Sequence, residues 1–317
     1  MTLPDPEGDL RDGTVYVYND EIKLAVNVGL ATGRPLLVRG APGSGKSSLA
    51  ASVAAKLGWR YYEKVVTSRT EARDLLWRFD TVRRFSDANA NTLKPAEDYI
   101  QPGVLWWAFD PESARYRGLP LERRAGVRPL RDPGHREHER AVVLIDEIDK
   151  ADPDVPNNLL VELGSRRFMV YETGVEVGSS HVPFIVITTN NERALPDAFL
   201  RRCVVLSLPD PDPRIPEQAE ILKKRLIEVG KAHLNEWGFE AIREAAADKV
   251  LELGRQARER RTRGPSTAEY LDLLWACKHL NIAASDDARW AEITAAALWK
   301  HVTAADAKTP APDEGEL

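Results

Sequence analysis

Residues Gly40–Ser47 read G-A-P-G-S-G-K-S and stand between two segments of different character. Before them runs the short apolar stretch 35–39 (P-L-L-V-R), and after them runs 48–55 (S-L-A-A-S-V-A-A), which is rich in helix formers. Strand, glycine-rich loop and helix is the order in which the pattern G-x-x-x-x-G-K-[ST] cradles phosphate. The glycines let backbone N–H groups converge on an anion, and the helix adds the positive end of its dipole. The stretch therefore predicts a nucleotide-binding loop in an α/β domain.

The residues of this loop have distinct expected roles. Lys46 should place its ammonium between the β- and γ-phosphates, and Ser47 should offer its hydroxyl to Mg²⁺. The remaining loop residues should bind phosphate mainly through their backbone. The expected nucleotide-binding set is Gly40, Ala41, Pro42, Gly43, Ser44, Gly45, Lys46, Ser47 and Ser48, joined by Asp146 from a later strand.

That later strand is an apolar run that ends in two acids. Residues 142–147 read V-V-L-I-D-E, as expected for a buried central strand of a parallel sheet. Such a strand delivers Asp146 to its carboxyl end, where ligands bind in open α/β sheets. There Asp146 can hold Mg²⁺ together with Ser47, and Glu147 can polarise an attacking water. An isolated acid pair would be interpreted as solvated surface, but the phosphate loop upstream favours the catalytic role.

Two further candidates carry alternative interpretations. Asn190 ends the apolar run 182–190 and can orient the water or contact the γ-phosphate, although an asparagine that starts a turn explains the local sequence equally well. Arg201 and Arg202 precede the apolar strand 203–208 and have no evident phosphate within their own subunit. They either supply a guanidinium in trans to a neighbour's nucleotide or form a surface salt-bridge pair.

The bulk composition is that of a globular protein. Of 317 residues, 43% are hydrophobic and 29% are charged. The two cysteines, Cys203 and Cys277, are far apart, which disfavours a disulfide framework or a zinc site and favours a reducing, cytoplasmic compartment. We expect neither a signal peptide nor a membrane span. A net charge of −5 gives no general attraction to nucleic acid, although residues 115–140 hold eight arginines against four acids.

Strands alternate with helices as far as residue 208, and everything beyond the proline-rich boundary 209–213 has helical patterning. This order predicts a parallel five-stranded αβα nucleotide-binding domain followed by a small all-helical lid domain. The expected divisions are an N-terminal tail at 1–13, the αβα domain at 14–209, the lid at 210–303 and a disordered acidic tail at 304–317. Insertions are expected at about 80–103 and 112–140, and a hairpin at 168–177.

Several local expectations accompany this division. A helix is expected at 70–78 and another at 285–302, whereas the arginine-rich stretch 118–140 should be a mobile surface loop that is disordered without a partner. If Trp106 and Trp107 lie on a strand, they face opposite sides, so that one of them can point to solvent or a partner, although an ordinary two-sided core accounts for the pair nearly as well.

Four segments, taken in order and spacing, resemble the AAA+ ATPases. They are Gly40–Ser47, L-I-D-E-I-D-K-A at 144–151, I-T-T-N at 187–190, and L-P-D-A-F-L-R-R-C at 195–203. The stretch Gly103-Val104-Leu105, the hairpin at 168–177 and the segment 190–198 are similar to the MoxR branch, in particular its carbon monoxide dehydrogenase maturation type.

The resemblance implies ATP and Mg²⁺ as cofactors and ATP hydrolysis as the activity. It makes Lys46 and Ser47 part of Walker A, Asp146 and Glu147 the Walker B acids, and Asn190 sensor 1, with Arg201 or Arg202 as the arginine finger. The segment 15–18 and the helix after it would border the adenine. One departure is that the stretch 264–269 lacks the sensor 2 arginine found in many MoxR proteins, so Arg261 or Arg263 would have to take that place.

The resemblance also implies a nucleotide-dependent ring, most simply a hexamer, that remodels or matures a protein client in a chaperone-like way. Clients with a von Willebrand factor A domain are typical of the MoxR branch. Two alternatives stay open. One is a nucleic-acid remodelling motor of McrB type, favoured by the arginine-rich stretch 115–140 and opposed by the net charge. The other is a nucleotide switch in a signalling or defence complex.

Overall fold

The computed structural model describes residues 13–134, 136–179, 181–235, 239–282 and 284–298. The expected tail at 304–317, the last residues of the expected lid and all of the expected N-terminal tail except Gly13 lie outside these ranges.

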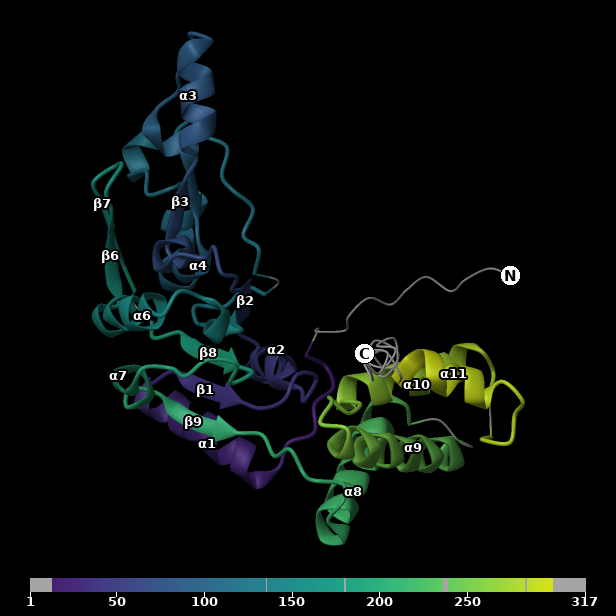
Figure 1. Cartoon of the computed structure of the whole chain (residues 1–317). Coiled ribbons are helices and arrows are strands. Elements are labelled where there is room, and N and C mark those ends of the chain that lie inside the picture. Colours follow the sequence, from purple (N-terminus) through teal and green to yellow (C-terminus); the bar gives the residue numbers. More distant parts are fainter. Residues whose placement is uncertain (1–12, 135, 180, 236–238, 283, 299–317) are drawn as a thin grey trace, which may run out of the picture.

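Five parallel strands form the central sheet in the order β2-β5-β8-β1-β9 (Figure 1). Strands β5 and β8 are buried along their whole length, which is why both are continuous apolar runs in the sequence. The expected parallel five-stranded sheet, with helices around it and a helical region after it, is confirmed. The bounds are β1 Leu36–Arg39, β2 Arg60–Val65, β5 Ala141–Asp146, β8 Phe184–Thr189 and β9 Val204–Ser207.

Helices cover both faces of the sheet and bury two separate apolar cores. Along β1, Leu36 and Val38 belong to one core and Leu37 to the other, as the two-residue period of a strand requires. The first core is closed by α1 and α2, and the second by α4, α6 and the elements inserted near them. The helices of this domain are α1 Asp20–Thr32, α2 Lys46–Leu57, α4 Val104–Phe109, α5 Pro111–Arg115, α6 Asp154–Ser165 and α7 Asp197–Leu200.

An insertion rises from the sheet domain and ends in the projecting helix α3 Thr81–Asn89 (Figure 1). Its stem is the antiparallel pair β3 Trp77–Phe79 and β4 Ile100–Pro102. The helix expected at 70–78 is therefore wrong: only the short 3₁₀ turn Ala72–Leu75 forms, and pairing with β4 draws the next residues into a strand. The helical spacing of this segment did not decide its structure, because pairing with a strand distant in the sequence did.

The stem is anchored at its base by aromatic packing. The Trp77 ring stacks on Phe168 of the hairpin β6 Arg167–Val170 and β7 Val175–Gly178, at 5.6 Å between centroids. Its indole N–H donates to Glu172 at the turn of that hairpin, at 2.8 Å. Trp106 and Trp107 are not on a strand: both lie in α4 and both are buried, so neither faces a partner.

The arginine-rich stretch 118–140 contains little regular structure, as expected, but it has defined contacts. Asp132 accepts a hydrogen bond from the Tyr62 hydroxyl at 3.0 Å, and Leu119 is buried. Arg124 donates to the Leu119 carbonyl and to the Glu112 carboxylate. The expectation of a disordered loop overlooked these anchors, because polar side chains can tether a segment that buries few apolar ones.

Four helices after the sheet form a second unit with an apolar core of its own, which includes Leu226, Ile242 and Tyr270. The helix expected at 285–302 begins later, because residues 284–289 form turns and the helix starts at Trp290. The helices are α8 Pro216–His233, α9 Glu240–Glu259, α10 Thr267–His279 and α11 Trp290–Leu298.

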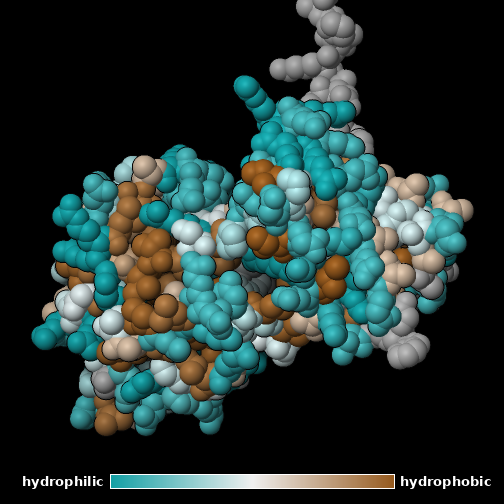
Figure 2. Space-filling view, turned by 90° about the horizontal axis from the view of Figure 1, so that it is seen from below, coloured by the Kyte–Doolittle hydropathy of each residue, from teal (hydrophilic) through white to brown (hydrophobic). Residues whose placement is uncertain are grey.

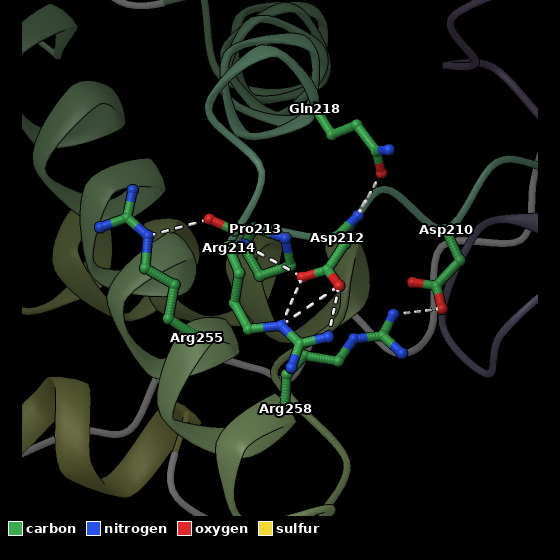
Figure 3. A network of polar contacts seen from close by, with 7 residues as sticks. All are labelled: Asp210, Asp212, Pro213, Arg214, Gln218, Arg255 and Arg258. Atoms are coloured by element: carbon green, nitrogen blue, oxygen red, sulfur yellow. Dashed lines mark hydrogen bonds and ion pairs between the residues drawn. The ribbon is translucent and has the colours of Figure 1, made fainter.

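A polar network fixes the proline-rich connection between the two units (Figure 3). Arg258 of α9 binds Asp210 at 2.6 Å, and Arg255 donates to the Pro213 carbonyl at 2.9 Å. Asp212 is held from both sides, since it pairs with Arg214 while its N–H donates to the Gln218 side chain. The connection is thus tied to α8 and α9, which limits how the helical unit can sit against the sheet domain.

No helix among the described residues is both long and apolar enough to serve as a membrane span.

The stem and the tip of the insertion should respond differently to truncation. Trp77 is 2% exposed and Phe85, on α3, is 69% exposed. We expect Trp77→Ala to lower the free energy of unfolding by about 3–5 kcal/mol, since it leaves a cavity in the core. Phe85→Ala should change it by no more than about 0.5 kcal/mol. Urea denaturation of both variants measures this, and equal effects would contradict the assignment of stem and tip.

Candidate functional site

The loop Gly40–Ser47 connects the carboxyl end of β1 to the first turn of α2, as the sequence predicts. Gly43 and Gly45 adopt positive φ angles of 74° and 90°, which a residue with a side chain would rarely tolerate. The Lys46 ammonium donates to the carbonyls of Gly40 and Ala41, at 2.9 Å each. The lysine at the end of the loop is thus hydrogen-bonded to the first two residues of the loop, which keeps its charge beside the loop backbone.

Burial lowers the pKa of Lys46, while the nearby acids Asp146, Glu147 and Asp149 act in the opposite direction. The direct hydrogen-bond partners of the ammonium are neutral carbonyls, and the three acids act on it from farther away.

Ser47 and Asp146 come together from α2 and β5. The Ser47 hydroxyl donates to Asp146 Oδ1 at 2.7 Å. Thr188 on the neighbouring strand β8 donates to the same oxygen at 2.5 Å, and its own oxygen accepts the Glu147 N–H at 2.9 Å. Thr188 is fully buried, so this hydroxyl fixes both acids of the pair. A carboxylate and a hydroxyl oxygen at one point are ligands that suit Mg²⁺.

Glu147 is held at both carboxylate oxygens. Asn190 donates to its Oε1 at 3.2 Å and Lys150 to its Oε2 at 2.6 Å. Its backbone is left-handed, with φ 62° and ψ 49°, an unusual conformation for a glutamate. Asn190 therefore faces the acid pair and is not occupied by a turn of its own.

The helical unit closes over the loop. The α10 amide of Ala268 donates to the Gly43 carbonyl at 3.2 Å, and a Cβ added at Gly43 would lie 2.4 Å from Ser266 Oγ. On another side Tyr16 lies against Gly45, and burial raises the pKa of its hydroxyl. A cleft between loop and helical unit is lined by Ala41, Pro42, Ser44, Arg225, Arg258, Arg263 and residues 264–267, among others.

Arg261 and Arg263, the two candidates for the sensor 2 position, differ in where their side chains lie. Arg263 lines the cleft, pairs with Glu269 at 3.8 Å and acts electrostatically on Lys46. Arg261 does not line this cleft and is exposed. Ser266 caps α10 in a capping box with Glu269, so a serine and not an arginine stands at the start of that helix.

Arg201 and Arg202 are not part of this constellation. They follow α7 and precede β9, whose first residue Val204 pairs with Leu36 at the start of β1. The loop Gly40–Ser47 follows the other end of β1, about 10 Å farther along the strand. Both arginines are exposed, and Arg34 fixes their position by donating to the carbonyls of residues 201–203. They lie at the edge of the sheet opposite the loop.

Thr188 and Lys150 were overlooked as site residues in the sequence. A threonine inside an otherwise apolar strand was the available signal for Thr188. Lys150 stands three residues after Glu147, but a 3₁₀ turn brings the two together, and no sequence pattern predicted that turn. Arg225 lies on α8, far in the sequence from every motif, and no sequence pattern predicted its contact with Ser44.

The Thr188 hydroxyl should matter for stability out of proportion to its size. Thr188→Val keeps the shape but leaves the Glu147 N–H without an acceptor, so we expect a loss of about 1–3 kcal/mol in the free energy of unfolding. Thr294 is equally buried, and its hydroxyl donates to Ala291 within its own helix. Thr294→Val should cost no more than about 0.5 kcal/mol. Similar losses in urea denaturation would contradict the bridging role.

Comparison with known proteins finds partial relatives. An alignment of 135 residues relates the chain to Holliday junction branch migration complex subunit RuvB 1 of Synechococcus sp. (strain JA-3-3Ab) at 29% identity. It covers 37% of this chain and 36% of that protein. RuvB 2 of the same organism aligns at 28%, with the same coverage. The chain thus matches little more than a third of the length of either relative.

Among solved structures, the Thermotoga maritima RuvB Holliday junction branch migration motor superposes with a TM-score of 0.45 at 14% identity, over 87% of this chain and 67% of that one. Its P216G mutant gives a TM-score of 0.46 at 13% identity, over 87% and 68%.

A family model matches a larger part of the chain. The model of the AAA domain (dynein-related subfamily) covers residues 35–203, more than half of the sequence, from the residue before β1 to the residue before β9. That range contains the phosphate loop, the acid pair, Thr188 and Asn190. The chain belongs to the AAA domain family, in its dynein-related subfamily.

Proposed function

We propose that this protein hydrolyses ATP in a Mg²⁺-dependent reaction. The observation that supports this best is the meeting of Lys46, Ser47, Asp146, Glu147 and Asn190 at the carboxyl edge of one parallel sheet, through the contacts Ser47–Asp146 and Asn190–Glu147. Each has the chemistry its role needs: an ammonium for phosphate, two oxygen ligands for a metal, and a carboxylate and an amide to orient water.

The two oxygen ligands that Ser47 and Asp146 offer suit Mg²⁺, which takes its other ligands from water and phosphate, better than a metal that needs a complete set of protein ligands. No cluster of three or more potential ligands among histidine, cysteine and the acids occurs in the described part of the chain. Mg²⁺ commonly binds one or two protein oxygens, with waters and substrate phosphates as its other ligands. Ser47 and Asp146 would hold the ion, which when bound neutralises charge on the phosphates. Glu147, in turn, would accept a proton from water once its contacts with Asn190 and Lys150 rearrange.

Two substitutions should separate binding from turnover. Lys46→Ala should abolish ATP binding, because Lys46 contacts phosphate in the ground state. Glu147→Gln should leave ATP affinity within a few-fold of the parent and stop hydrolysis, because the carboxylate acts on water in the transition state. ATP affinity and steady-state phosphate release measure both. Hydrolysis by Glu147→Gln within a few-fold of the parent would refute the role of Glu147.

We further propose that the active unit is a nucleotide-dependent homo-oligomeric ring, with Arg201 or Arg202 completing a neighbour's site. Their position at the edge opposite the loop supports action in trans. Figure 2 shows apolar side chains gathered on one face of the molecule, and α1 and β9 carry exposed apolar residues. Leu24 is 64% exposed and Val205, on the edge strand, 43%. A neighbouring copy would cover this surface, and a hexamer is the expected ring.

Mixing two inactive variants tests the shared site. Lys46→Ala subunits keep the arginines and lose their own site, whereas Arg201→Ala/Arg202→Ala subunits keep the site and lose the arginines. If the arginines act in trans, each preparation alone should have little activity and the mixture should regain ATP hydrolysis at the interfaces where an intact site meets intact arginines. A mixture no more active than its components would contradict action in trans, since an arginine finger contributes about 10³-fold or more to turnover.

For the client, we propose protein remodelling of the MoxR kind, in the cytoplasm, on a partner with a von Willebrand factor A domain. The insertion supports this, since α3 buries none of its residues and stands clear of the sheet domain (Figure 1). The basic stretch 115–140 is partly neutralised, because Arg123 pairs with Glu97 and Arg124 with Glu112.

Nucleic-acid remodelling is the second candidate, favoured by the alignment with the RuvB relatives. DNA-stimulated hydrolysis with a steep salt dependence would favour it, and stimulation by a co-encoded protein would favour the first.

A further inference from the structure

We propose that Asp149 is a positioning residue for ATP hydrolysis, because it holds the loop that carries Asn190 against Glu147. The inference rests on the proposed function and adds to it a residue that acts through Asn190 and not on the nucleotide. Asp149 lies in the 3₁₀ turn Ile148–Lys150, which follows the acid pair, and it is only 3% exposed.

Two hydrogen bonds of opposite direction join the turn after β5 to β8 and the loop that follows it. The Thr188 hydroxyl accepts the N–H of Glu147 at 2.9 Å, and Asp149 Oδ2 accepts the N–H of Glu192 at 2.9 Å. Along both segments these hydrogen bonds flank the contact between the Asn190 amide and Glu147, at 3.2 Å. The relative position of Asn190 and Glu147 is therefore fixed by a backbone contact on each side.

The loop after β8 has a conformation that needs such a contact. Asn191 is left-handed, with φ 58°, which is uncommon for a residue with a side chain. Its N–H donates to Thr189 Oγ1 at 3.0 Å, a contact that lies within the same segment. Glu192 follows, and Asp149 accepts its N–H from the neighbouring turn. Without that acceptor the loop can relax, and the Asn190 amide loses its fixed direction.

The second oxygen of the Asp149 carboxylate supports a functional role. This oxygen, Oδ1, is buried and has no hydrogen-bond partner in the described part of the chain. A buried carboxylate that is satisfied at one oxygen only is costly, so stability alone does not account for an acid at this position. A charged acceptor does form a stronger hydrogen bond with an N–H than a neutral one. Its charge also acts on Lys46 and Lys150, two ammonium groups of the site.

Steady-state ATP hydrolysis by the full-length protein, measured over a range of MgATP concentrations, tests this proposal. Asp149→Ala removes the acceptor, and we expect kcat to fall about tenfold to a hundredfold, because a displaced Asn190 no longer orients water. The KM for ATP should stay within about threefold, because the lost contact serves turnover and not binding. Asp149→Asn keeps an oxygen that can accept the Glu192 N–H, so its kcat should lie within about threefold of the parent.

Asp149→Leu fills the same space without an acceptor and should lose kcat as Asp149→Ala does. It carries the test if the alanine variant does not fold, and far-UV circular dichroism with urea denaturation shows which variants fold.

Asp152→Ala is the matched control. Asp152 also accepts a backbone N–H, from Asp154 at 3.1 Å, but it is exposed and its contact stays within its own turn. Its kcat should stay within about twofold of the parent.

A kcat of folded Asp149→Ala within twofold of the parent would overturn the proposal. An equal loss in Asp149→Ala and Asp149→Asn would also overturn it, because the charge and not the hydrogen bond would then be responsible. A raised KM with unchanged kcat would do the same by assigning Asp149 to nucleotide binding. Absence of hydrolysis by the parent, or normal hydrolysis by Glu147→Gln, would refute the proposed function instead.

Discussion

The oxygen atoms of Ser47, Asp146 and Thr188 meet at one point because β1, β5 and β8 are parallel and end at the same edge of the sheet. In a parallel sheet the carboxyl ends of neighbouring strands lie side by side, and polar residues placed just beyond each end share one space. The Thr188 hydroxyl also accepts a hydrogen bond from the backbone N–H of Glu147, so that Glu147 is tied to the same point. The apolar parts of the strands are buried in the core, and the polar residues at their carboxyl ends form the site.

If Glu147 acts on water as we propose, its contacts give a way in which hydrolysis can be controlled. Both of its carboxylate oxygens are engaged, by the Asn190 amide and the Lys150 ammonium, and its backbone adopts a conformation that is costly for a residue with a side chain. A residue held in this way must change partners before it can act on water.

The sequence predicted the parts of the molecule whose local and tertiary preferences agree. The runs that became β1, β5 and β8 are apolar except at their carboxyl ends, and the glycines of G-A-P-G-S-G-K-S favour a tight loop. It was wrong where a distant partner decided the outcome, as at residues 77–79, which pair with β4, and at Trp106 and Trp107, which a helix buries. The contact of Lys150 with Glu147 and the contact of Arg225 with Ser44 could not be predicted, because they depend on a 3₁₀ turn and on the docking of a second unit. Neither the turn nor the docking produces a periodic pattern in the sequence.

Calorimetric titration of ATP into the full-length protein, with Mg²⁺ and then with the metal chelated, tests the central claim most directly. If Ser47 and Asp146 share a metal with the phosphates that Lys46 holds, a single nucleotide should bind per chain, and removing Mg²⁺ should weaken binding markedly. Absence of saturable binding, or an affinity that does not depend on Mg²⁺, would contradict the account.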